Sequence, residues 1–164
     1  MPDFEEEEAF FELLLKNPNH LHHGFKLINV YLCRYSPSDD QLRRLEEAGC
    51  FIDPHICVRN YRHNLVEYLI REGRLNPNDH IHDICLTPYH RDRPEDFLLT
   101  LKLLIDYGAD IDGLDSQDRS PLECLQSNRP LRWIGEPYIR KIIKQREKAR
   151  KEINNKKINR YLVD

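Results

Sequence analysis

The chain has 164 residues, of which 40% are hydrophobic and 32% are charged, and its formal net charge is −3. This length suits one domain of about 100–150 residues, and the apolar content excludes a wholly disordered chain. No apolar run approaches the roughly 18–20 residues of a membrane span, so we expect no membrane association. The five cysteines are scattered and no apolar leader opens the chain, so we expect reduced thiols and a cytoplasmic location.

The first half of the chain contains three helix patterns. Residues 4–16 predict an amphipathic helix, whose apolar face consists of Phe4, Phe11, Leu14 and Leu15. The Ser and Asp residues at 36–40 form a helix start signal, and the helix that they predict ends at Gly49. A third apolar stripe ends at Gly73 and consists of Leu65, Val66, Leu69 and Ile70. Glycine adopts the left-handed conformation of a helix end at little cost, so both glycines predict helix ends.

The strongest pattern lies at residues 87–125. Thr87-Pro88 begins it, and Gly108 ends a helical stripe of Leu101, Leu104 and Ile105. Ser120-Pro121 then repeats the type of dipeptide found at Thr87-Pro88. A Thr or Ser cap before a proline is a favourable helix start, so both dipeptides predict one. Pro94 disfavours a helix interior, so we expect the helix after Thr87 to be reduced to a turn and the next helix to start near Pro94.

The C-terminal segment is strongly basic. Residues 140–164 contain ten Lys or Arg and three acidic residues, a net charge of +7, which leaves −10 for residues 1–139. Residues 126–137 predict a loop that carries Trp133, followed by a long helix that begins near Pro137. Its apolar stripe consists of Ile139, Ile142, Ile143, Ala149 and Ile153. We therefore expect residues 1–139 to form a domain and a basic helix at 137–164 to continue from it, with its first half covering the end of the domain and the rest solvated.

These patterns resemble the ankyrin repeat, which begins Thr-Pro-Leu-His and has a period of about 33 residues. The residues that carry the resemblance are Thr87-Pro88-Tyr89-His90, Gly108-Ala109-Asp110 and Ser120-Pro121-Leu122-Glu123, and the interval from Thr87 to Ser120 equals the period. Gly49 and Gly73 lie closer together than one period, so the earlier part of the chain departs from it. The resemblance implies an all-α solenoid of about three and a half to four degenerate repeats, with an N-terminal helix and a long C-terminal capping helix.

The resemblance also implies a function. Ankyrin-like proteins are non-catalytic modules that bind other folded proteins through loop tips, called fingers, and through the exposed sides of their inner helices. One finger would contain Leu114, Asp115, Gln117, Asp118 and Arg119. A second finger would contain Asn78, Asp79, His80 and His82, with Tyr89 and Arg91 on the adjoining inner surface. The degeneration of the repeats favours a viral or bacterial protein that modulates a host factor in the host cytoplasm or nucleus.

Other functions have weaker support in the sequence. Gly-x-Ser-x-Gly, His-Glu-x-x-His and phosphate-loop motifs are absent, so we expect no enzyme, no cofactor and no small-molecule substrate. His80, His82, Cys85 and His90 lie close together in the sequence, but their spacing matches no zinc pattern, so no metal site is predicted. Nucleic-acid binding through the basic segment at 140–160 is the alternative function, and it requires a steep salt dependence.

Overall fold

The computed structural model describes residues 4–22, 25–88 and 93–161, and within them the fold is all-α apart from one hairpin of two-residue strands. The elements, in chain order, are α1 (Phe4–Lys16), β1 (Leu21–His22), β2 (Phe25–Lys26), α2 (Leu27–Arg34), α3 (Asp39–Glu47), α4 (Pro54–Arg59), α5 (His63–Arg71), α6 (Pro77–Leu86), α7 (Pro94–Asp106), α8 (Pro121–Ser127) and α9 (Arg129–Tyr161). The strands pair antiparallel, with Leu21 opposite Lys26.

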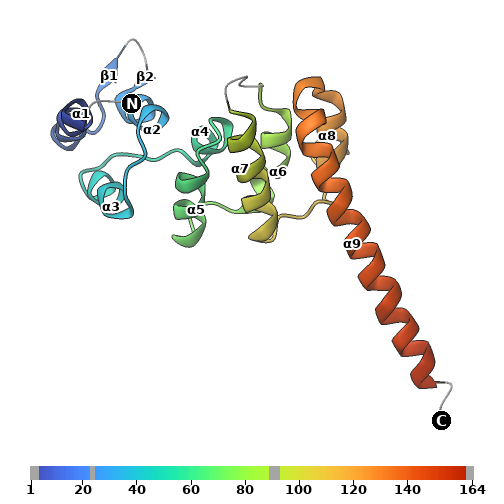
Figure 1. The fold of residues 1–164 in the computed structure, drawn as a ribbon. Coiled ribbons are helices and arrows are strands. Elements are labelled where there is room, and N and C mark those ends of the chain that lie inside the picture. The colour runs from blue at the N-terminus through green and yellow to red at the C-terminus, as the bar shows by residue number, and fades with distance from the viewer. Residues whose placement is uncertain (1–3, 23–24, 89–92, 162–164) are drawn as a thin grey trace.

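The helices are arranged in two rows that lie side by side (Figure 1). In the first row α2 contacts α4, α4 contacts α6 and α6 contacts α8. In the second row α5 contacts α7 and α7 contacts α9, and each first-row helix from α4 onward also packs on the helix that follows it. Helix α1 packs on α2 and α3 at the N-terminal end. Each element therefore mainly contacts its neighbours along the stack, and the core is a continuous layer between the rows.

Local signals explain where most of these helices begin and end. The first-row helices α4, α6 and α8 each have proline in the first turn after an N-cap residue whose side chain accepts a hydrogen bond from a backbone N–H of that turn. These N-cap residues are Asp53, Asn76 and Ser120. The helices α3, α5 and α7 are followed by Gly49, Gly73 and Gly108, whose φ angles are +95°, +69° and +97°. These positive angles confirm the predicted glycine stops, because L-residues with a side chain rarely adopt them.

Several other sequence predictions are confirmed. Helix α1 spans the predicted residues 4–16, although Phe4 is 77% exposed and lies outside its buried face. Helix α3 starts with a capping box between Ser38 and Gln41. The predicted core residues Leu65, Leu69, Leu101, Leu104 and Ile105 are buried, whereas Leu122 is half-buried against the core.

The predicted helix start at Thr87-Pro88 is wrong, because Thr87 is the C-cap of α6. A residue that precedes proline avoids the helical conformation, and Thr87 has φ −61° and ψ 142°. The Thr87 hydroxyl donates to the carbonyl of Asp83 at 2.7 Å, which closes the helix end. The turn expected between Thr87 and Pro94 falls mainly on residues 89–92, which lie outside the described residues. Helix α6 begins at Pro77, before the expected start, and α7 begins at Pro94 as predicted.

The predicted loop at 126–137 is also wrong, because α9 begins at Arg129 and contains Pro137. Pro137 cannot donate a hydrogen bond to the Trp133 carbonyl, but Trp133 is 79% exposed, so water can reach that part of the helix. Buried Leu131 and Ile139 hold the helix against the core on either side of Pro137. Tertiary packing therefore keeps this segment helical.

The second half of α9 extends beyond the other helices (Figure 1). Ile139 is fully buried, Ile142 and Ile143 are half-buried, and Ile153 is 54% exposed. The expectation that only the first half of the basic helix covers the stack is confirmed. No described helix is long and apolar enough to cross a membrane.

Candidate functional site: the first-row face and the 110–119 loop

Residues 110–119 form a loop between α7 and α8 that is longer than the connections before α4 and α6, and Asp115 organises it. One carboxylate oxygen of Asp115 accepts the backbone N–H groups of Gln117 at 2.8 Å and Arg119 at 2.9 Å. The other oxygen accepts Nε and Nη2 of Arg119 at 3.1 Å and 2.8 Å. The Arg119 backbone N–H and guanidinium, with the Gln117 N–H, hold the pKa of Asp115 well below its usual range.

The 110–119 loop is anchored to α6 by two side chains. The backbone N–H of Asp110 donates to Asn78 Oδ1 at 2.7 Å, and His82 Nε2 lies 3.0 Å from the Gly113 carbonyl oxygen, to which it donates. The sequence predicted that Asn78 and His82 belong to a second finger. That prediction is wrong, because Asn76-Pro77 starts a helix there and both residues lie within α6.

The loop presents a mixture of apolar and polar side chains to solvent. Leu114 is 62% exposed and contributes the large apolar side chain. Gln117 and Asp118 are also exposed, and Asp118 has a φ angle of +55°. Of the other predicted contact residues, Asp79 is exposed and His80 is half-buried on α6, while Tyr89 and Arg91 lie outside the described residues.

A hollow of about 540 Å³ lies on the first row, where α2 and α4 meet Thr87 and Pro88. Val30, Cys33 and Ile56 contribute to its lining. Burial raises the pKa of the Cys33 thiol, although Arg62 and Arg93 partly oppose this effect, so this cysteine lacks the thiolate character of an activated nucleophile. No sequence motif marks the hollow, because its lining comes from separate helices.

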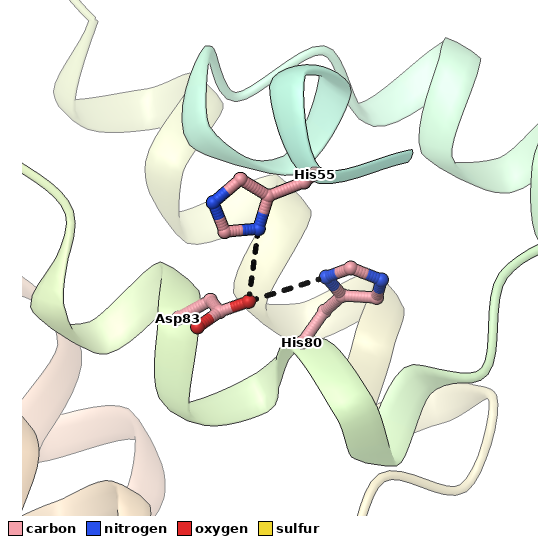
Figure 2. Close-up of side chains that lie close together, drawn as sticks. All are labelled: His55, His80 and Asp83. Carbon is pink, nitrogen blue, oxygen red and sulfur yellow. Dashed lines mark hydrogen bonds and ion pairs between the residues drawn. The ribbon is translucent and has the colours of Figure 1, made fainter. Parts of the chain in front are cut away.

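The described members of the His/Cys group considered in the sequence do not form one cluster. His82 turns toward Gly113, Cys85 is fully buried, and His90 lies outside the described residues. His80 instead meets His55 of α4 and Asp83 of α6 (Figure 2). The wide separation of His55 and His80 along the chain hides this cluster from a search for local motifs, and only the contact between α4 and α6 reveals it.

Comparisons with known proteins found no similarity. No protein-family model, no curated protein and no solved structure matches the chain. The surfaces of the molecule are therefore the basis for a functional proposal.

Proposed function

We propose that the chain is a non-catalytic, ankyrin-repeat-type module that binds another folded protein. Paired helices in two rows, glycine stops after α3, α5 and α7, and a long loop before α8 support this proposal. Stacks of this type offer a broad and rigid surface for recognition. The proposed contact surface combines the 110–119 loop with the exposed side of α6.

The observation that carries the proposal is the order of the 110–119 loop. The Asp115 carboxylate accepts four hydrogen bonds within the loop, and Asn78 and His82 tie the loop to α6. A preordered loop loses little conformational entropy when it binds a partner. Leu114 offers an apolar contact beside the polar groups of Gln117 and Asp118, which is the composition of a small protein-binding patch.

Site-specific photo-crosslinking tests this proposal. A photoreactive amino acid would replace Leu114 in the loop or Leu99 on α7, which is 47% exposed and serves as the matched control. In an extract of the organism that encodes the chain, we expect a discrete covalent adduct from position 114 and none of that mass from position 99. Adding Asp115→Ala should abolish the adduct, because it removes the hydrogen bonds that order the loop. An adduct that forms equally at both positions would contradict the proposal.

A second candidate function is nucleic-acid binding through the distal half of α9. The observation that favours it is the exposure of residues 147–156, which extend a basic helix beyond the stack (Figure 1). In this case the affinity for a labelled oligonucleotide should fall steeply with salt, with a log–log slope of about −0.9 for each duplex phosphate contacted. Deletion of residues 146–164 should abolish this binding but leave the crosslink from position 114. A flat salt dependence would exclude it.

A further inference from the structure

His55, His80 and Asp83 form a cluster at the contact between α4 and α6 (Figure 2). Asp83 Oδ2 lies 3.1 Å from His55 Nδ1 and 3.4 Å from His80 Nδ1. The ligand atoms that the three side chains offer all lie within 4.8 Å of one another. We propose that these three residues bind a zinc ion.

The two distances from the carboxylate oxygen to the imidazole nitrogens match those around tetrahedral zinc. Zinc lies about 2.0–2.1 Å from a nitrogen or oxygen ligand, which places two tetrahedral ligand atoms about 3.3 Å apart. The two distances from Asp83 Oδ2, 3.1 Å and 3.4 Å, are close to this value. The ligand atoms lie within 4.8 Å of one another, so binding an ion requires the two imidazole rings to approach each other by up to about 1.5 Å, while the carboxylate oxygen already lies at the correct separation from both nitrogens.

His80 provides independent support for metal binding. Its side chain is only 15% exposed, and its buried Nδ1 atom has no hydrogen-bond partner among the described residues. The Asp83 oxygen lies 3.4 Å away, but the geometry is not that of a hydrogen bond. Buried nitrogens without partners are rare in folded proteins and call for an explanation. A metal ion bound to Nδ1 satisfies this atom, with the ring proton on Nε2.

The backbone holds the three ligands in place before any ion binds. His80 and Asp83 occupy positions i and i+3 of α6, so they project from the same side of that helix. His55 lies in the first turn of α4, where its backbone N–H donates to the N-cap side chain of Asp53 at 2.9 Å. The contact between α4 and α6 sets the distance between the two halves of the site.

The ligand set favours zinc over magnesium or calcium. Two imidazole nitrogens and one carboxylate oxygen suit zinc, whereas the other two ions prefer oxygen ligands. His55 and Asp83 also line a surface hollow of about 220 Å³, which leaves room for water as the fourth ligand. Arg59 lines the same hollow, and its positive charge opposes the binding of a dication.

The proposal is tested by titrating the metal-free chain with zinc chloride and measuring the binding by calorimetry. We expect one zinc ion per chain, and weaker binding in His55→Gln, His80→Gln and Asp83→Asn. Loss of an outer partner of a zinc ligand already costs about 10- to 100-fold in affinity, so loss of a ligand should cost at least as much. Arg59→Gln should tighten binding. The control is His63→Gln. His63 lies 3.9 Å from a carboxylate oxygen of Asp96 and is not one of the three proposed zinc ligands.

Cobalt as a spectroscopic substitute distinguishes this site from adventitious binding to the cysteines. A site of two histidines and one aspartate should give visible bands of tetrahedral cobalt without thiolate charge-transfer absorption. His55 is 47% exposed, so His55→Gln should fold normally, which circular dichroism of the metal-free chain checks. Undiminished zinc affinity in all three ligand variants, thiolate absorption, or no saturable binding would overturn the proposal.

Discussion

Gly135 provides a sensitive test of the packing between α9 and the core. It lies inside α9 and is buried, and a Cβ atom placed on it would meet Leu125 Cδ1 at 2.9 Å, Leu125 Cδ2 at 3.1 Å and Phe97 Cε1 at 3.2 Å. Leu125 and Phe97 are fully buried in the core, so a shift of either side chain disturbs the packing of its neighbours. The absence of a side chain at residue 135 therefore allows α9 to approach α7 and α8 closely.

The change Gly135→Ala brings two opposing effects into competition. Alanine is favoured over glycine in a helix interior by about 1 kcal/mol. Adding a methyl group to a packed core costs about 1–3 kcal/mol. Since the closest contact of 2.9 Å requires a buried side chain to shift, we expect the packing cost to exceed the gain in helix propensity. The variant should lose about 1 kcal/mol of unfolding free energy.

Urea denaturation followed by circular dichroism measures this difference. A double-mutant cycle with Leu125→Val supplies the control, since valine withdraws the two Leu125 methyl groups that cause the closest contacts. The double variant should be more stable than the sum of the two single effects predicts. Stabilisation by Gly135→Ala alone, as expected for an exposed helix position, would refute the close approach of α9 to the core.

Three further predictions concern Leu104, Gly108 and Asp115. Leu104 is fully buried, so Leu104→Ala should reduce the unfolding free energy by about 2–5 kcal/mol, and an unchanged urea midpoint would contradict its placement. Gly108 has φ +97° and open space around an added Cβ, so Gly108→Ala should cost about 1 kcal/mol for backbone reasons alone, and Gly108→Asn should cost less in the same assay. Folding lowers the pKa of Asp115, so its contribution to stability should be complete above the unfolded pKa of about 3.9 and decline as the pH falls below that value. Asp115→Asn should therefore flatten the acid limb of a stability–pH profile, and an unaltered limb would argue against the hydrogen bonds of the loop.

The sequence by itself determined the helix boundaries that depend on one turn of chain. Four predictions agree with the structure: the helix start signal at 36–40, the Ser120-Pro121 start, the Pro94 start and the glycine stops at 49, 73 and 108. These signals involve hydrogen bonds or backbone angles within a few residues, so distant parts of the chain do not alter them. The all-α fold is predictable for the same reason, whereas the ankyrin-type arrangement and its partner surface remain proposals.

Only the tertiary structure decided the remaining features. Thr87-Pro88 has the composition of a helix start, but α6 extends to Leu86, directly before this dipeptide. Thr87 is therefore the C-cap of α6. Pro137 suggested a helix start, but Leu131 and Ile139 pack against the core and extend α9 back to Arg129. His55 joins His80 and Asp83 because α4 packs on α6. In each case contacts between helices stabilise the observed arrangement. These contacts join side chains that are distant in the sequence, so no local pattern predicts them.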